Sequence, residues 1–115
     1  MLRGEIRVAD FEPSRGSEAD KRRPAVVVSN DRANATATRL GSGVVTVIPV
    51  TSNVSRVYPF QTLLPAELTG LSIDSKAQAE QVRSLAVQRI GEVVGHLPAS
   101  LMLQLDDALR LHLQL

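Results

Sequence analysis

The chain has 115 residues, of which 43% are hydrophobic and 22% are charged, and it contains no cysteine. This length fits one domain over residues 1–115 that buries a sizeable core. The lack of cysteine excludes disulfide scaffolds, cysteine-ligated zinc, iron–sulfur clusters and thiol catalysis. A formal net charge of +1 excludes a polycationic arm that holds nucleic acid by bulk charge, so any such function needs a local site.

Neither a membrane span nor a secretion signal is visible in the sequence. No apolar run reaches the roughly 18 residues that a membrane-spanning helix needs. The charged residues Arg3, Glu5 and Arg7 do not lead into the apolar core of a signal peptide. We therefore expect a cytoplasmic protein without membrane association.

Most of the chain predicts short strands. A segment without apolar periodicity, residues 12–23, follows the first of them, and loops of that length are usually functional or disordered. Asn30 and Asp31 can cap a short helical segment over Arg32–Arg39. Pro49 implies a bulge or an edge in its strand. The expected strands cover Gly4–Phe11, Pro24–Ser29, Val44–Val50 and Pro59–Leu64, with two more inside Ile73–Leu85.

The C-terminal segment changes from strand to helix periodicity. From about Pro98 onwards, Met102, Leu105, Leu109 and Leu113 recur at spacings of three and four, which predicts an amphipathic helix. The expected fold is therefore mainly β with α: one small, curled, mainly antiparallel sheet packed with a C-terminal helix.

Familiar catalytic and cofactor signals are missing. His96 and His112 belong to no paired ligand spacing, so we expect no metal site. The turn at Gly41–Gly43 lacks the third glycine of a phosphate-binding loop, and no Gly-x-Ser-x-Gly elbow occurs. We therefore expect no cofactor.

One basic segment stands out, because it leads directly into a strand. Taken alone, Lys21-Arg22-Arg23 is most simply a solvated basic loop. Pro24, however, biases Arg23 towards extended backbone, so that its guanidinium projects from a restrained position. A restrained guanidinium is well matched to two oxygens of one phosphate. Thr51 ends the Val44–Val50 strand, where its hydroxyl either closes a local hydrogen bond or contacts a ligand.

Several short segments follow one another along the chain in an order and with a spacing that match a known family. They are Arg3–Ile6, Asp10–Pro13, Gly16–Glu18, Arg23–Asp31, Val47–Ser52, Tyr58–Phe60 and Glu80–Ser84. Together, from Arg3 to the final helix, they resemble the MazF/PemK toxins of bacterial toxin–antitoxin pairs.

The resemblance implies a fold, an activity and partners. The fold would be an SH3-like barrel of the CcdB/PemK type, in a homodimer inhibited by a cognate, MazE-like antitoxin. The activity would be metal-independent, sequence-specific cleavage of single-stranded RNA, including mRNA, to 2′,3′-cyclic phosphate and 5′-hydroxyl ends. We expect the antitoxin to compete with RNA for the basic loop from Arg15 to Arg23.

The resemblance also assigns residues. The family's catalytic arginine, threonine and glutamate fall on Arg23, Thr51 and Glu18, and its base-reading pair falls on Glu80 and Gln81. The remaining residues expected to bind RNA are Ser17, Lys21, Arg22, Ser52 and Asn53.

One position departs from the family pattern. Relatives usually carry an aromatic residue just after Gly-Glu-Ile, where this chain has Arg7 and Val8.

In the family's reaction the ribose 2′-oxygen attacks the adjacent phosphorus. Arg23 and Thr51 suit the stabilisation of charge on the phosphoryl oxygens. A guanidinium stays protonated at neutral pH, so Arg23 is a poor free-standing base. Glu18 or a bound water would then accept the 2′ proton.

Two other functions remain open at the level of sequence. A CcdB-type gyrase poison would share the fold without cleaving RNA, but it has no need of the Arg23-Pro24 and Thr51-Ser52 pairs. An SH3-like module that binds peptides normally needs an aromatic-lined groove. The chain has only three aromatic residues, Phe11, Tyr58 and Phe60, which disfavours such a module.

Overall fold

The computed structural model describes residues 1–11 and 22–115. The strands are β1 (Glu5–Asp10), β2 (Arg22–Val27), β3 (Val44–Thr51), β4 (Gln61–Leu64), β5 (Ser75–Gln78), β6 (Arg83–Ala86) and β7 (Ile90–His96). The helices are α1 (Asp31–Leu40), α2 (Ala66–Thr69) and α3 (Ala99–Leu113), with 3-10 turns η1 (Ala79–Gln81) and η2 (Val87–Arg89). No helix in this part of the chain is both long and apolar enough to span a membrane.

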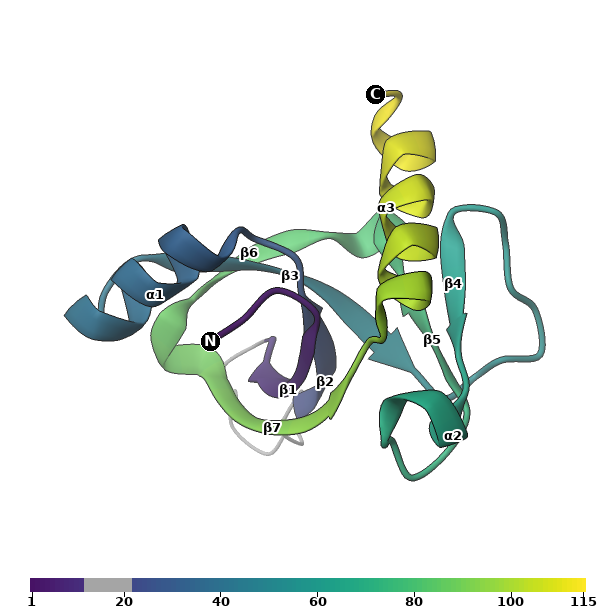
Figure 1. Cartoon of the computed structure of the whole chain (residues 1–115), viewed down its shortest axis with the longest axis horizontal. Coiled ribbons are helices and arrows are strands. Elements are labelled where there is room, and N and C mark those ends of the chain that lie inside the picture. Colours follow the sequence, from purple (N-terminus) through teal and green to yellow (C-terminus); the bar gives the residue numbers. More distant parts are fainter. Residues whose placement is uncertain (12–21) are drawn as a thin grey trace, which may run out of the picture.

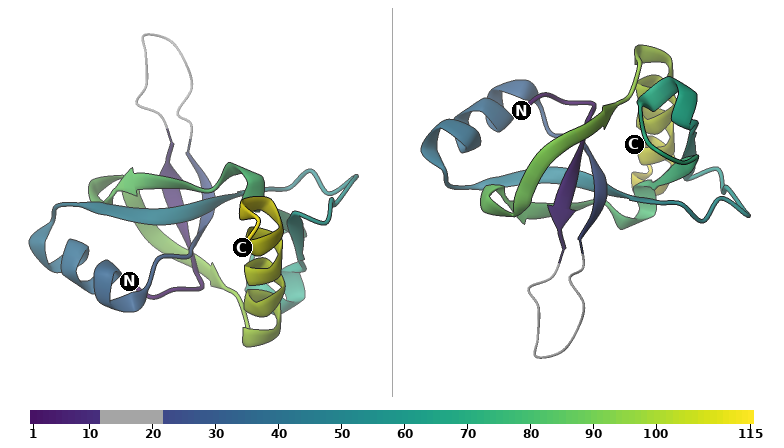
Figure 2. Two further views of the ribbon diagram at one scale, coloured as in Figure 1. Left: turned by 90° about the horizontal axis from the view of Figure 1, so that it is seen from above. Right: turned by 90° about the horizontal axis from the view of Figure 1, so that it is seen from below.

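Strand β3 is the centre of the sheet, and Figure 2 shows it crossing the molecule from α1 towards β4 and β5. The order is β4-β5-β3-β2-β1-β7, all antiparallel, and β6 also pairs with β3. On that side of β3, β6 pairs with Val44–Val47 and β5 pairs with Val50 and Thr51. Pro49 lies in the gap between these two ladders, where its missing N–H costs no bond to either strand. The irregularity predicted at Pro49 is therefore present.

The predicted fold class is confirmed, but the sheet is not closed into a barrel. Figure 1 shows β7, β1, β2, β3 and β6 curving round one side of the molecule, with α3 standing beside β4 and β5. Within the described residues no ladder joins β6 to β7, because η2 turns the chain between them. The outermost strands β4 and β7 do not pair either, so the curled sheet stays open.

Successive side chains on the central strands β2 and β3 point to opposite faces of the sheet and contribute to two separate hydrophobic cores. In β2, Val26 faces one core while Ala25 and Val27 face the other. In β3, Val45 and Val47 enter the second core, whereas Ile48 and Val50 enter the first. A sheet buried on both faces reads as an apolar run rather than as an alternating pattern, which explains the β-branched sequences of both strands. The first core also contains residues of α3, and the second contains Ala37 of α1.

Helix α1 is capped at both ends, and Arg3 links it to α3. The Asn30 side chain accepts a hydrogen bond from the Ala33 N–H, and Gly41 ends α1 in the left-handed conformation. The helix predicted after Asn30 is therefore confirmed, with Asp31 as its first residue. Arg3 joins the helices, because its backbone N–H donates to the Asp31 carboxylate and its guanidinium pairs with Asp106 on α3.

The structure differs from the sequence-based expectations in three places. Strand β7 was not predicted; it has two glycines and is mostly exposed, so its pairing with β1 rather than its own pattern fixes it. The connection expected after Leu64 contains the short helix α2. In α3 the buried face consists of Leu101, Leu105 and Ala108, whereas Leu113 from the predicted apolar stripe is half exposed.

The burial pattern of α3 predicts opposite effects for two leucines two residues apart. Leu105 is 0% exposed and Leu103 is 65% exposed. Leu105→Ala should lower the free energy of unfolding by about 2–5 kcal/mol, because it leaves a cavity between α3 and the sheet. Leu103→Ala is the matched control and should change it by no more than about 0.5 kcal/mol. Equal losses in urea denaturation would contradict this packing of α3.

Candidate active site

Arg23 and Thr51 line one pocket of about 430 Å³, which we call the Arg23–Thr51 pocket. Arg23 stands near the start of β2, and Thr51 is the last residue of β3. The connection between α2 and β5 also contributes to its lining. The lining consists of Arg23, Pro24, Val50, Thr51, Ser52, Leu71, Ser72, Ile73 and Ser75.

The strand register explains why these two residues meet. In the β2–β3 ladder Ala25 pairs with Pro49 and Val27 with Val47. Continuing this antiparallel register by two residues places Arg23 opposite Thr51, just beyond the end of the paired segment. Directly opposed residues of an antiparallel pair have their side chains on the same face. The arginine and the hydroxyl are therefore juxtaposed by the sheet rather than by a loop.

The Thr51 hydroxyl is oriented but keeps its proton available. Its Oγ1 accepts a hydrogen bond of 3.3 Å from the Asn53 backbone N–H. Asn53 in turn folds the following turn, because its Oδ1 accepts from the Ser55 N–H and hydroxyl. The O–H of Thr51 remains a donor for a ligand in the pocket. The Thr51 hydroxyl can therefore both close a local hydrogen bond and contact a ligand, the two roles considered from the sequence.

The Arg23 guanidinium lies against an aromatic ring rather than against a carboxylate. Its Cζ is 5.8 Å from the centroid of Phe11, and the Cζ of Arg83 on β6 is 5.6 Å from the same centroid. Phe11 is only 7% exposed and belongs to the second core. Over residues 1–11 and 22–115 neither arginine forms an ion pair. The ring thus restrains two positive charges without neutralising them.

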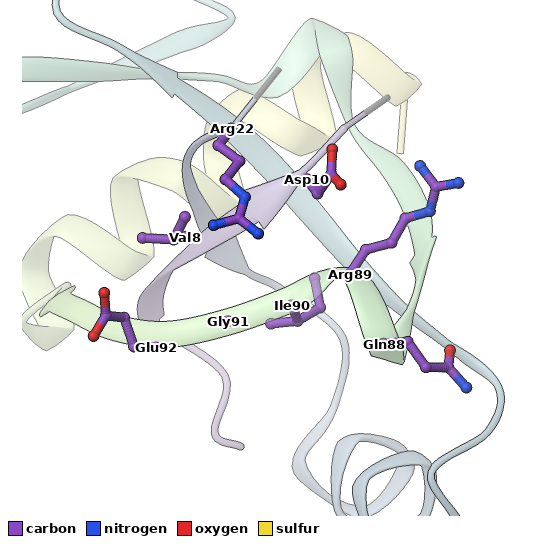
Figure 3. A pocket seen from close by; sticks show the side chains of 8 residues that line it. All are labelled: Val8, Asp10, Arg22, Gln88, Arg89, Ile90, Gly91 and Glu92. Atoms are coloured by element: carbon purple, nitrogen blue, oxygen red, sulfur yellow. The ribbon is translucent and has the colours of Figure 1, made fainter. Parts of the chain in front are cut away.

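A second pocket, of about 250 Å³, contains the expected RNA-binding residue Arg22 (Figure 3). We call it the Asp10–Arg22 pocket. It lies where β1 and β2 meet the start of β7, and it is lined by Val8, Asp10, Arg22, Gln88, Arg89, Ile90, Gly91 and Glu92. Sequence reasoning did not identify this pocket.

Arg7, beside this pocket, is already engaged. Its Nε pairs with Glu5 at 2.9 Å and its Nη1 donates to the Gly91 carbonyl at 3.0 Å. Burial alone would raise the pKa of Glu5, but hydrogen bonds from the Leu2 N–H and from Arg7 outweigh it and lower that pKa. Arg7 therefore helps to hold β1 against β7.

The other expected site residues are distributed less simply. Ser52 lines the Arg23–Thr51 pocket. Asn53 does not line it, but its backbone N–H donates a hydrogen bond to the Thr51 hydroxyl. Glu80 and Gln81 lie on η1 and line neither pocket; Glu80 Oε2 accepts from Gln61 Nε2 at 2.6 Å. The assignments to Ser17, Glu18 and Lys21 lie outside the described residues.

Sequence reasoning missed Ser72, Ser75 and Arg83. The two serines follow α2, and Ser75 donates its hydroxyl to the Ile73 carbonyl. No local pattern distinguishes them from ordinary turn residues. Arg83 could have been noticed in the sequence. It lies two residues before buried Leu85 on the same strand, so both side chains are on the sheet face that covers the second core.

No group of three His, Asp or Glu residues lies close enough to hold a metal ion within the part of the chain that the structure describes. The polar residues that line the Arg23–Thr51 pocket are one arginine, one threonine and three serines. Such donors suit the oxygens of an anion.

Comparison with known proteins identifies the family. Residues 2–113 match the model of the PemK-like, MazF-like toxin of type II toxin–antitoxin systems. The chain belongs to this family. It is 64% identical to Endoribonuclease MazF9 of Mycobacterium tuberculosis, covering 100% of the chain and 98% of that protein. It is 31% identical to Endoribonuclease EndoA of Bacillus subtilis, covering 100% and 96%.

Solved structures of MazF-like toxins share the fold. MazF from Deinococcus radiodurans has a TM-score of 0.78 and 29% identity, with 100% of this chain and 97% of that chain covered. MazF in a MazE–MazF structure from the same organism has a TM-score of 0.79 and 30% identity, with 100% and 96% covered. The resemblance to the MazF/PemK toxins inferred from the sequence is therefore confirmed.

Proposed function

We propose that this MazF-like toxin cleaves single-stranded RNA in the Arg23–Thr51 pocket. The observation that supports this most directly is that Arg23 and Thr51, at neighbouring ends of β2 and β3, line one pocket. The predicted endoribonuclease class is confirmed by relatives of that name that align over the whole chain. The alternative of a CcdB-like gyrase poison is not favoured, because the matching family and the full-length relatives are those of MazF-like endoribonucleases.

In the proposed reaction the ribose 2′-oxygen attacks phosphorus and the 5′-oxygen of the next nucleotide leaves. The products are a 2′,3′-cyclic phosphate and a 5′-hydroxyl. Arg23 spans two phosphoryl oxygens with parallel N–H donors, and Thr51 donates its hydroxyl to the same group. Because a permanent charge and a hydroxyl supply this stabilisation, the step does not need a metal ion. Glu18 or a water accepts the 2′ proton, and the departing oxygen takes up a proton.

We expect the substrate to be single-stranded. The base contacts of RNA-binding proteins are mostly made to unstacked bases, and a base-paired strand cannot bring its bases into a pocket. Exposed Arg22 and Arg23 give the start of β2 a local positive charge that attracts the backbone. Ser17, Lys21, Ser52, Asn53, Glu80 and Gln81 remain proposed RNA contacts.

The partners follow from the family. MazE occurs with MazF in the Deinococcus structure, which supports an antitoxin partner for this chain. We propose that a MazE-like segment with acidic residues covers Arg22 and Arg23, so that it competes with RNA. We propose further that the toxin is a homodimer and that it acts in the cytoplasm.

Arg23→Lys should be nearly as damaging as Arg23→Ala. A lysine keeps the charge but cannot donate two parallel hydrogen bonds to one phosphate. We expect the cleavage rate to fall by a factor of roughly 100 or more in both variants. Single-turnover cleavage of a fluorescent RNA measures this. Arg39→Lys, an exposed arginine at the end of α1, is the matched control and should retain full activity. Recovery of most activity in Arg23→Lys would reduce the role of Arg23 to simple charge.

Cleavage should persist in excess EDTA and should require single-stranded RNA. The same oligonucleotide is tested alone and annealed to its complement, with and without chelator. We expect undiminished cleavage of the single strand and resistance of the duplex. Loss of activity on chelation would contradict the proposed mechanism, and efficient cleavage of the duplex would contradict the proposed substrate.

A further inference from the structure

We propose that the Asp10–Arg22 pocket is a nucleotide subsite, in which Asp10 selects an RNA base that carries an exocyclic amino group. Guanine, adenine and cytosine have such a group, and uracil does not. This inference rests on the proposed function, since it assigns part of the same substrate to a second place on the sheet.

The position of the pocket beside the Arg23–Thr51 pocket supports this. Val8 pairs with Pro24 and Asp10 with Arg22 in the β1–β2 ladder, so these four side chains share one face. Arg22 lines one pocket and Pro24 lines the other. Residues two apart on a strand are separated by about 7 Å, which is comparable to the step between neighbouring nucleotides. A strand of RNA at Arg23 can therefore continue across β2 into the second pocket.

A carboxylate oxygen of Asp10 that accepts no hydrogen bond supports a base with an amino group as the ligand. Asp10 Oδ1 is buried and has no hydrogen-bond partner among the described residues. Asp10 forms no ion pair with either Arg22 or Arg89, although all three line the pocket. A buried carboxylate oxygen without a donor is costly, and a ligand that brings an N–H group relieves the cost. Carboxylates recognise amino-bearing bases in this way, as in contacts to the N4 amino group of cytosine.

The wall opposite Asp10 is shaped by an irregularity in β7. Arg7 pairs with Val93, but Ala9 pairs with Ile90, so β7 carries one more residue than β1 between these pairs. Such a bulge re-aims side chains and is frequent beside functional sites. Gly91 lies in the bulge, and a Cβ there would approach the Val8 carbonyl to 3.2 Å. The Arg7 bond to the Gly91 carbonyl fixes this wall before any ligand arrives.

Two arginines at the pocket suit the RNA backbone. In Figure 3 Arg22 extends towards β7, whereas the Arg89 guanidinium points outwards. Arg22 is exposed and Arg89 is half-buried, and neither is in an ion pair with a described residue. Charged groups at a rim contact phosphate without reading sequence, while the inner carboxylate reads the base. The pocket volume of about 250 Å³ is smaller than that of most drug-binding pockets, as expected for one base.

The test compares base preferences on an RNA library randomised around the cleavage site. Sequencing of the products of wild type and of Asp10→Asn gives the preference at each position. We expect wild type to disfavour uracil at one position next to the cleaved bond, and Asp10→Asn to lose about ten-fold of this discrimination. The amide keeps the shape of the carboxylate but offers a donor that the uracil carbonyl accepts. Asp107→Asn, on the exposed side of α3, is the matched control and should leave the preference unchanged.

An unchanged preference in a folded Asp10→Asn variant would overturn the proposal. A wild-type protein that cleaves no RNA would instead contradict the proposed function, so the two failures are distinguishable. If Asp10→Asn does not fold, Arg89→Gln decides the question. It should raise KM for all sequences alike without changing kcat, as loss of a phosphate contact does, whereas Arg110→Gln on α3 should have no effect. An unaltered KM in Arg89→Gln would overturn the subsite.

Discussion

The antiparallel pairing of β2 with β3 is the constraint on which the rest of the molecule depends. Its register places alternate side chains of both strands into two different cores. Extended beyond its last pair, the same register places Arg23 opposite Thr51. A shift by one residue would exchange the two cores and separate the arginine from the hydroxyl. Stability and the candidate active site are therefore specified by the same hydrogen-bonded ladder.

The same strands explain how a nearly neutral chain can bind an anionic polymer. Arg22 and Arg23 are adjacent in sequence, but they contribute to two different pockets on either side of β2. Phe11 restrains Arg23 and Arg83 by stacking rather than by ion pairing, so the charges stay available to a ligand. Arg3 and Arg7, in contrast, are engaged with Asp106 and Glu5 and hold the fold together. Local placement of a few arginines thus replaces bulk charge.

Much of the fold could be predicted from the sequence, because the buried strands and helices carry strong local signals. The β-branched runs of β2 and β3, the Asn30 cap and the periodicity of α3 are of this kind. Strand β7 could not be predicted, since Gly91 and Gly95 weaken its pattern and its pairing partner is distant in sequence. The open sheet could not be predicted either. It does not close into a barrel because η2 separates β6 from β7, and no local sequence pattern predicts this turn.

For the candidate site the same distinction holds. Pro24 and the end of β3 distinguish Arg23 and Thr51 within the sequence itself, because both flank strands. The Asp10–Arg22 pocket depends on the β1–β7 register and its bulge, which only the folded chain shows. Glu80, expected to read bases, lies outside both pockets and accepts a hydrogen bond from Gln61. The sequence thus indicated the proposed phosphate-binding residues more clearly than those of the proposed base subsite.

The central claim is that Arg23 and Thr51 act on the same phosphate, and a double-mutant cycle tests it most directly. Single-turnover cleavage rates of wild type, Arg23→Ala, Thr51→Val and the double variant give the coupling between the two side chains. If both donate to one phosphoryl group, the double variant should lose less than the two single losses combined, with a coupling of about 0.5–3 kcal/mol. Losses that simply add, or a fully active Thr51→Val variant, would contradict the account.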